Sequence, residues 1–467
     1  MTSNSIKFEN SSFRDNLGNV YYFNNKVLRT VSKEGKENYE FLKTSEILKN
    51  SIISEFLINT NEIDKKYLPK FFTKFDYVLE SELIPFISYP YEWTFDQLKK
   101  AALHHLEFQI FLFKKGAVLR DASAYNIQFI GSKPYFIDVL SIKPYEDGEY
   151  WIAYKQFCEN FLNPLLLGYL KGVQHNNWFR GSLEGVDTIE LNNILNLIDK
   201  ISINVFIHVH LQAKLNKKSL TNPNEISLKY KKLKKLSKKS YISILYQLKN
   251  WISKMSFRKQ KSIWQNYSQE HTYDKEEYNE KKLFVSDFIK KRKPKSLIDL
   301  GCNTGEFSNL ALNSGVTSVV GFDFDHNVIS RAFNEAFQKE KNFLPLVFDA
   351  ANPSPNQGWD QIERKGFLER FRSEALLALA FEHHLIIGKN IPILKFINWI
   401  IKVSKNGIIE FVPKSDETIQ KMLEFREDIF HDYSQENFEK CLLEKSNIIN
   451  KTVITKTGRI LYEYEVL

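Results

Sequence analysis

The chain has 467 residues and a formal net charge of +9, with 43% hydrophobic and 26% charged residues. This length favours more than one domain, and this composition excludes a disordered chain. Three scattered cysteines argue against a disulfide framework and a structural zinc site, and no apolar stretch reaches the ~20 residues of a membrane span. The first residues, MTSNSIKFENSSF, show no basic region followed by an apolar run, so we predict no secretory signal and expect a soluble cytoplasmic protein.

The first part of the chain predicts a small mixed lobe followed by a long helix. Between residues 11 and 83, alternating apolar and aromatic residues indicate a hairpin around Asn24-Asn25, and NYEFLKTSEILKNSIISEFL has helical periodicity. A long helix should begin after the cap Thr94 and end at Gly116. Short strands should follow in AVLRDA, YNIQFI and PYFIDVL.

These short strands carry a set of acidic and amide residues. In RDASAYNIQFIGSKPYFID, Asn126 follows Asp121 by five residues and Asp138 follows Asn126 by twelve. The spacing resembles that of protein kinases and related phosphotransferases. The resemblance implies a divergent kinase-like α+β domain over residues 1–172, with Asp121 as the base, Asn126 and Asp138 as magnesium ligands, and ATP as the phosphate donor.

Several residues depart from the kinase pattern. Leu119 replaces the catalytic-loop histidine, Leu140 replaces the glycine after the metal-binding aspartate, and Arg29 is the nearest candidate for a phosphate-pairing cation. The sequence therefore favours a kinase-like fold more than kinase activity. The alternative is that Asp121 and Asn126 stabilise a loop or bind substrate.

Residues 173–261 are predicted to form a helical basic connector. Residues 214–261 contain fifteen lysines or arginines against one glutamate, a local excess larger than the net charge of the whole chain. In KYKKLKKLSKKS, Tyr230, Leu233 and Leu236 are spaced three apart, as in a helix with a narrow apolar stripe. This pattern fits a solvated helix between domains, or one that contacts an anionic carrier or membrane surface.

Alternating strands and helices predict a parallel sheet in a third domain, residues 262–467. SLIDL has the apolar run of a buried strand, and the turn GCNTG that follows it precedes a helical pattern. Gly301 and Gly305 allow close approach of a ligand, and Asn303 tolerates positive φ. The next strand, TSVVGFDFD, brings Asp323 to the position where an acid meets ribose hydroxyls in dinucleotide folds.

Two cofactor classes compete for this geometry. A dinucleotide would place its pyrophosphate against Glu306, and the G-x-G-x-x-G spacing is absent. S-adenosylmethionine carries a sulfonium and an ammonium but no phosphate, so the acids Asp299 and Glu306 are compatible with it. LIDLGCNTG resembles the first motif of class I S-adenosylmethionine-dependent methyltransferases, which ends a strand as (V/L)LDLGCGTG.

The resemblance implies a role for each matching position. The turn should hold the methionine part of the cofactor, and Asp323 should bind the ribose. Asp349, at the end of NFLPLVFDA, should bind the adenine amino group. Tyrosines in WQNYSQEHTY are candidates to fold over the cofactor, and a Rossmann-like domain that has lost its ligand is the alternative. In full, the cofactor candidates are Asp299, Gly301, Asn303, Gly305, Asp323, Asp349, Tyr267 and Tyr273.

A cluster of three polar residues should lie near the methyl acceptor. EALLALAFEHHL predicts a central fourth strand, with Glu382, His383 and His384 at its carboxyl edge, where open parallel sheets place their chemistry. A hydroxyl acceptor must lose its proton as it attacks, and one of the histidines is a candidate base, His384 being expected to face inward. The alternative is a packed, hydrogen-bonded histidine.

The region from Trp264 onward also resembles the NoeA-like group of nodulation methyltransferases, found among genes for surface or secreted glycans. The resemblance implies a saccharide or another small hydroxyl compound as substrate. Trp359 could stack on a sugar ring or pack in the core. Nucleic acid is disfavoured as a substrate, because FEHH replaces the D/N-P-P-Y/F tetrapeptide of many base methyltransferases.

Three functions therefore remain open at the level of sequence. The first is a methyltransferase with a kinase-like domain fused in front, in which both domains could modify the same glycan. The second is a methyltransferase whose front domain is a non-catalytic substrate-binding module. The third, a nucleic-acid methyltransferase guided by the lysine cluster, ranks last. For all three we expect an α/β chain with a Rossmann-like doubly wound sheet at its C-terminal end.

Overall fold

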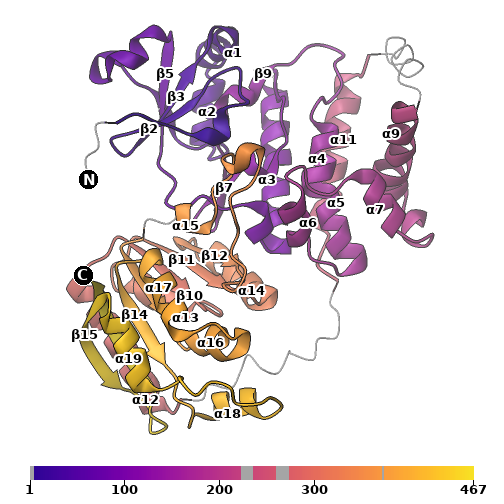
Figure 1. Ribbon diagram of the computed structural model, residues 1–467. Coiled ribbons are helices and arrows are strands. Elements are labelled where there is room, and N and C mark those ends of the chain that lie inside the picture. The colour runs from indigo at the N-terminus through magenta and orange to yellow at the C-terminus, as the bar shows by residue number, and fades with distance from the viewer. Residues whose placement is uncertain (1–4, 222–234, 259–272, 371–372) are drawn as a thin grey trace.

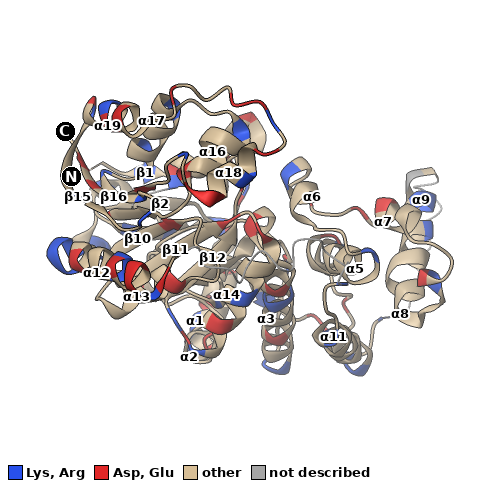
Figure 2. Ribbon diagram, turned by 90° about the horizontal axis from the view of Figure 1, so that it is seen from below, with Lys and Arg blue, Asp and Glu red and all other residues tan. Residues whose placement is uncertain are grey.

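The computed structural model describes residues 5–221, 235–258, 273–370 and 373–467. They form two units that lie against each other, the front unit (residues 5–258) and the C-terminal unit (residues 273–467) (Figure 1). No helix among the described residues is long and apolar enough to cross a membrane. Acidic and basic segments are interspersed over both units (Figure 2).

The front unit begins with a five-stranded antiparallel sheet of strand order β1-β2-β3-β5-β4. The expected hairpin is confirmed: β2 and β3 pair around Asn24 and Asn25, whose φ angles of 46° and 60° suit a tight two-residue turn. The elements are β1 (Lys7–Phe8), β2 (Val20–Phe23), β3 (Lys26–Val31), α1 (Lys33–Thr44), α2 (Ile47–Ile53), β4 (Thr60–Glu62) and β5 (Tyr77–Ser81).

The long helix α3 (Phe95–Lys114) begins and ends as the sequence predicts. Thr94 accepts a hydrogen bond from the Gln97 backbone N–H, and the Gln97 side chain accepts one from the Thr94 N–H, which forms a capping box. Gly116 follows with φ of 78°. The short strands after it are β6 (Ala117–Leu119), β7 (Ile127–Ile130), β8 (Lys133–Phe136) and β9 (Ile142–Pro144), paired as β6-β9 and β7-β8.

Part of the expected connector forms a helix, α11, that packs against α3 within the front unit. Helix α11 lies along α3, buries Leu245 and Leu248, and brings the Tyr241 hydroxyl within 3.0 Å of Gln109 Nε2. Tyr230 and Leu233 lie outside the described residues. The helices of this layer are α4 (Tyr154–Phe157), α5 (Asn163–Leu166), α6 (Asn176–Gly181), α7 (Thr188–Ile194), α8 (Ile203–Val205), α9 (Gln212–Thr221) and α11 (Lys238–Ser253).

The C-terminal unit is the doubly wound α/β fold that the sequence predicts. Its seven-stranded sheet has the order β12-β11-β10-β13-β14-β16-β15. The first five strands are parallel, and β16 runs antiparallel to both of its neighbours, β14 and β15. The strands are β10 (Ser296–Leu300), β11 (Ser318–Asp323), β12 (Phe343–Val347), β13 (Ala375–Ala378), β14 (Asn406–Phe411), β15 (Ser446–Val453) and β16 (Ile460–Val466).

Helices cover both faces of this sheet. Side chains that alternate along each strand separate into two apolar clusters, one shared with α12, α13 and α14 and the other with α16, α17 and α19. The helices are α12 (Lys275–Arg292), α13 (Glu306–Asn313), α14 (His326–Gln338), α15 (Phe367–Arg370), α16 (Glu382–Lys389), α17 (Ile393–Val403), α18 (Glu417–Leu423) and α19 (Gln435–Leu443).

The front unit packs against β12 and α14, as both ribbon views show (Figures 1 and 2). One apolar cluster runs through both units, with the Phe129 and Phe333 rings perpendicular at 5.8 Å. Gln97 Nε2 donates to the Pro345 carbonyl at 3.0 Å, and Arg370 forms a buried ion pair with Glu92. The edge of the C-terminal sheet is thus covered by the front unit.

Candidate functional site

The turn after β10 has the backbone geometry that the sequence predicts. Gly301, Asn303 and Gly305 have φ angles of 75°, 49° and 85°, which place all three in the left-handed region. A Cβ at Gly301 would lie 3.0 Å from the Phe381 ring, and one at Gly305 would lie 2.3 Å from the Phe343 ring. Aromatic rings therefore occupy the space that a Cβ would need at both glycines, so the packing of this turn as well as its positive φ angles requires glycine there.

Asp299 lies one residue before the end of β10 and faces α13. It is 2% exposed, and its Oδ2 accepts a hydrogen bond from the Ser308 hydroxyl at 2.6 Å. Burial raises the pKa of its carboxyl to about 6, and the nearby Asp323 carboxylate adds to this rise. Asp299 is thus a buried acid whose charge a cationic ligand would stabilise.

Asp323 ends β11 and faces the same turn. Its Oδ2 accepts from the Asn303 backbone N–H and its Oδ1 from the Asp325 N–H, both at 3.0 Å. Burial raises its pKa as well. Asp323 therefore connects the ends of two neighbouring strands.

Asp349 follows β12, the next strand in the sheet. It is exposed, and its Oδ1 accepts from the Ala351 N–H at 2.9 Å. Parallel pairing of β10, β11 and β12 brings their carboxyl ends to one edge of the sheet. The structure therefore brings Asp299, Asp323 and Asp349 together at one edge, as the cofactor prediction requires.

The three polar residues after β13 differ from the expectation. The strand ends at Ala378, and Glu382, His383 and His384 form the first turn of α16. Helical spacing reverses the predicted orientation: His383 is buried at 1% exposure, and His384 is exposed. The expectation that His384 faces inward is wrong, because the two residues lie on a helix and not on a strand.

Glu382 is fully buried and holds His383 in place. Its Oε1 accepts from the Val412 N–H at 2.8 Å and from the Tyr433 hydroxyl at 2.7 Å, while its Oε2 lies 2.9 Å from His383 Nδ1. A carboxylate beside Nδ1 favours the tautomer with the proton on that nitrogen. His383 Nε2, which has no hydrogen-bond partner among the described residues, is then left as an acceptor.

Of the two tyrosines predicted to fold over the cofactor, Tyr267 lies outside the described residues. Tyr273 belongs to a buried network of charged groups. The Tyr273 hydroxyl donates to Glu410 on β14 and accepts from Lys281 at 3.0 Å and from Arg459 at 2.6 Å. Burial, followed by the Glu410 charge, raises its pKa. The hydroxyl is thus fixed by protein groups.

Sequence reasoning missed the partners of Tyr273. The signal was a lone carboxylate, Glu410, within the apolar strand IIEFV, because a charge buried on a central strand needs a cation nearby. Lys281 supplies that cation at 2.7 Å, and Arg459 adds a second one that also pairs with Asp416 at 2.8 Å.

The acidic and amide residues of the front unit also converge. Asn126 Nδ2 donates to Asp121 Oδ2 at 2.7 Å, and Arg29 on β3 pairs with Asp138 at 2.7 Å and with Asp15 at 2.9 Å. Burial and the Asp138 charge raise the pKa of Asp121. Among the described residues no group of three or more His, Cys, Asp or Glu forms a metal cluster, so the magnesium assignment stays a prediction.

Comparison with known proteins adds information on the C-terminal unit and on the chain as a whole. Residues 270–383 match the family model for a methyltransferase domain. Over 456 residues the chain is 43% identical to the nodulation protein NoeA of Rhizobium meliloti (strain 1021), and the match covers 97% of this chain and 95% of that protein.

Solved structures show weaker likeness. The PH0226 protein of Pyrococcus horikoshii OT3 shares 16% identity at a TM-score of 0.33, over 45% of this chain and all of that one. The N-methyltransferase NodS of Bradyrhizobium japonicum WM9, in complex with S-adenosyl-L-homocysteine, shares 9% identity at 0.32, over 44% of this chain and 93% of its own.

Identity over nearly the whole length, a matching domain model and a doubly wound sheet agree with one another. The chain belongs to the NoeA family of nodulation proteins, and its C-terminal unit is an S-adenosylmethionine-dependent methyltransferase domain.

Proposed function

We propose that this protein transfers a methyl group from S-adenosylmethionine to a hydroxyl of a saccharide or another small cytoplasmic acceptor. The observation that supports it most directly is the glycine-bounded turn, with three acids at the ends of adjacent strands. In this proposal the turn formed by Gly301, Asn303 and Gly305, all with positive φ, binds the methionine part through its backbone, with Asp299 behind it. Asp323 binds the ribose and Asp349 the adenine.

The bound cofactor supplies an electrophilic methyl group, and the protein positions the acceptor and removes its proton. His383 Nε2 is our candidate base, with Glu382 as the residue that fixes its tautomer. Trp359 is 68% exposed, so its core-packing alternative is wrong and its ring remains open to a sugar.

Cofactor binding and acceptor choice can be tested separately. Calorimetry should show binding of S-adenosyl-L-homocysteine to the wild type and weaker binding to Asp323→Ala. Transfer of tritiated methyl groups to a panel of glycan precursors should then identify the acceptor class. Transfer to RNA or DNA, with none to any saccharide, would contradict this proposal.

A second candidate function concerns the front unit. The contact between Asn126 and Asp121, and the pairing of Arg29 with Asp138, favour a phosphotransferase-like site that uses ATP and magnesium. If this site is active, MgATP should raise the melting temperature of the wild type but not that of Asp138→Ala. No shift in the wild type would leave the front unit as a substrate-binding module.

The basic residues 214–261 support a further part of the proposal, contact with an anionic carrier of the acceptor or with a membrane surface. Binding to vesicles that contain an anionic lipid should weaken steeply between 50 and 200 mM salt. The motif FEHH argues against nucleic acid as the partner. Equal binding to neutral and anionic vesicles would exclude this contact.

A further inference from the structure

The end of the front unit that lies farthest from the C-terminal unit is a helical hairpin with an apolar surface (Figures 1 and 2). It consists of α7, the turn at residues 195–202, and one continuous helix, residues 203–221, that includes α8 and α9. Single exposed apolar side chains are common on protein surfaces, but a dense group of them marks an interaction site. The exposed large apolar side chains of this hairpin are Ile194, Leu197, Ile198, Ile201, Ile203, Phe206, Ile207, Leu211 and Leu215.

The turn of the hairpin is fixed by hydrogen bonds. The Asn196 side chain accepts from the Asp199 backbone N–H, and the Asp199 side chain accepts from the Asn196 N–H, both at 2.9 Å. Asp199 also forms an ion pair with Lys171, which balances the charge of the one acid in the turn. Leu197 and Ile198, between these two residues, are 84% and 76% exposed. The turn therefore holds two aliphatic side chains in solvent.

The helix after the turn has a face that points away from the rest of the front unit. On its inner face Val205 and Val209 are buried, and Nδ1 of the buried His208 lies 2.7 Å from the Tyr154 hydroxyl. The exposed residues of the outer face are Ile203, Phe206, Ile207, Leu211, Lys214, Leu215, Lys217 and Lys218. The outer face is thus apolar in its first half and basic in its second, and the sequence has no acid between Asp199 and Glu225.

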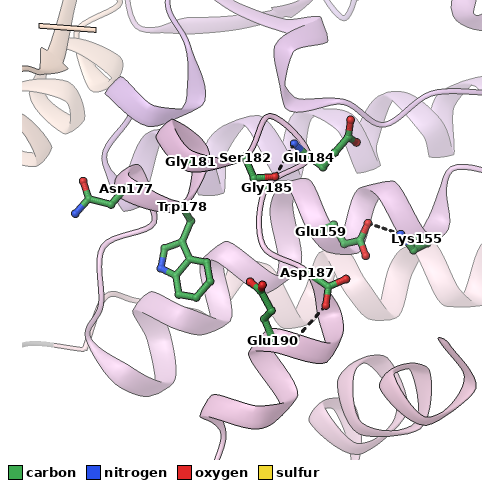
Figure 3. Close-up of a pocket in the computed structure, with 10 residues that line it drawn as sticks. All are labelled: Lys155, Glu159, Asn177, Trp178, Gly181, Ser182, Glu184, Gly185, Asp187 and Glu190. Atoms are coloured by element: carbon green, nitrogen blue, oxygen red, sulfur yellow. Dashed lines mark hydrogen bonds and ion pairs between the residues drawn. The ribbon is translucent and has the colours of Figure 1, made fainter. Parts of the chain in front are cut away.

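The acidic residues near this hairpin lie at its other end. Glu184, Asp187 and Glu190 line a hollow at the start of α7, beside Trp178 (Figure 3). Helix α7 runs from that hollow toward the turn. An anionic surface repels such acids and attracts lysines. The apolar end of the hairpin is therefore the end that suits a negatively charged partner.

The composition of this surface favours a lipid bilayer over a protein partner. Protein interfaces are anchored mainly by aromatic side chains and arginine, whereas the exposed apolar side chains of the turn are leucine and isoleucine, and the cations of the outer face are lysines. Aliphatic side chains beside lysines match acyl chains beneath anionic headgroups. Because no described helix is long and apolar enough to span a membrane, this contact is peripheral.

We propose that this hairpin docks the protein on an anionic membrane surface. Leu197, Ile198 and Ile201 insert between the lipid headgroups, and the lysines of α9 contact the headgroup phosphates. The docking rests on the membrane contact proposed above for residues 214–261 and adds to it an apolar insertion by a different segment. Salt screens the lysine contact but not the burial of apolar side chains, so the two parts can be measured separately.

The test is co-sedimentation of the full-length protein with vesicles of phosphatidylcholine that contain about one third phosphatidylglycerol. The wild type should bind at about 0.05 M salt, and a weaker binding should persist at about 0.5 M salt. The double variant Leu197→Ser, Ile198→Ser should bind about tenfold more weakly at both salt concentrations, because two aliphatic side chains no longer enter the bilayer. Phenylalanine at both positions should retain binding.

The lysines of α9 are tested by salt dependence. The triple variant Lys214→Gln, Lys217→Gln, Lys218→Gln should bind about tenfold more weakly at low salt and like the wild type at high salt. The matched control is Ile53→Ser with Leu283→Ser, which removes two aliphatic side chains of 68% and 64% exposure from α2 and α12. It should bind like the wild type.

Insertion can also be observed directly. The native cysteines Cys158, Cys302 and Cys441 are buried, so an environment-sensitive fluorophore can be attached at Ile201→Cys. Its emission should shift to the blue when vesicles are added, and the same label at Ile53→Cys should show no shift. Circular dichroism should show that all variants are folded.

Three results would overturn the insertion. They are binding of the serine pair as tight as that of the wild type, an unchanged emission of the label at residue 201, and a dimer of the full-length protein that the serine pair dissociates, which would assign the surface to a second copy of the chain. The electrostatic contact of residues 214–261 fails by a different result, equal binding of the wild type to vesicles with and without phosphatidylglycerol.

Discussion

At the scale of single residues, Asp299 in the proposed cofactor site is an acid whose burial lowers the stability of the folded protein. Its pKa in the folded protein is about 6, against an ordinary value of 3.8, because the carboxyl is buried. Between these two pH values the folded state binds more protons than the unfolded state. Stability must therefore fall as pH rises through this window. This loss of stability persists at neutral pH unless a cation binds beside the Asp299 carboxylate.

Replacing Asp299 by Asn tests this cost. At pH 7 the variant should be more stable than the wild type by up to about 3 kcal/mol, because the amide can still accept from Ser308 without a buried charge. Urea denaturation should show the two proteins converging near pH 3.5. Asp349→Asn, at an exposed position, should change stability little. A wild-type advantage at pH 7 would show that protein cations already compensate the charge.

The two histidines of α16 give a second test at this scale. His383 contacts Glu382 and is buried, whereas His384 is exposed. If His383 is the base, His383→Ala should lower methyl transfer by 10²-fold or more, with cofactor affinity retained. His384→Ala is the matched control and should keep most activity. A pH–rate profile that stays unchanged in Glu382→Gln would refute the positioning role of Glu382.

At the scale of elements, short sequence patterns predict where helices begin and where turns lie, but not which surface an element packs against. Three such predictions depend on a few adjacent residues and are confirmed: the hairpin at Asn24-Asn25, the helix cap at Thr94 and the positive φ of Asn303. The sequence predicts a strand up to Glu382, His383 and His384, because a short apolar run has the same pattern in a strand and in a buried helix. These residues begin helix α16, in which His383 is buried and His384 is exposed.

The packing of α11 was not predicted for a different reason. The prediction of a solvated helix concerned KYKKLKKLSKKS, most of which lies outside the described residues, whereas Tyr241, Leu245, Leu248 and Ile252 of α11 form a stripe that packs on α3. Packing of this kind depends on the partner surface, which lies over a hundred residues away in sequence. The ion pair between Lys281 and Glu410 was not predicted for the same reason.

The capping box of α3 provides the test at this scale. Thr94→Ala removes the hydroxyl that accepts from the Gln97 N–H, and both residues are buried. Loss of a buried cap should lower the free energy of unfolding by about 1–2 kcal/mol, which chemical denaturation can measure. Thr44→Ala, in the last turn of α1, is the control and should have a smaller effect. Equal effects would mean that the cap is not a significant stabilising contact.

At the scale of the whole molecule, the two units share an apolar core as well as buried polar contacts. Asp96 at the start of α3 accepts from Ser330 and from Asn334 on α14, the latter at 2.9 Å. Arg180 on α6 donates to the Asn352 carbonyl in the segment that follows Asp349. Because this segment begins next to Asp349, the proposed adenine contact, we expect the front unit to help to hold the proposed cofactor site.

The ion pair between Glu92 and Arg370 tests whether the units unfold together. Both side chains are at most 3% exposed, and Arg370 NH1 also donates to the Ile87 carbonyl at 2.7 Å. Glu92→Gln leaves the guanidinium buried without its counter-charge, so we expect a loss of about 3–5 kcal/mol. Arg14→Gln, which breaks the more exposed pair with Glu363 in the same interface, should cost less than about 1 kcal/mol. Scanning calorimetry should give one transition for the wild type, with a lower midpoint in Glu92→Gln. Two separate transitions in the wild type would show that the shared core does not couple the units, and that the front unit does not support the methyltransferase site.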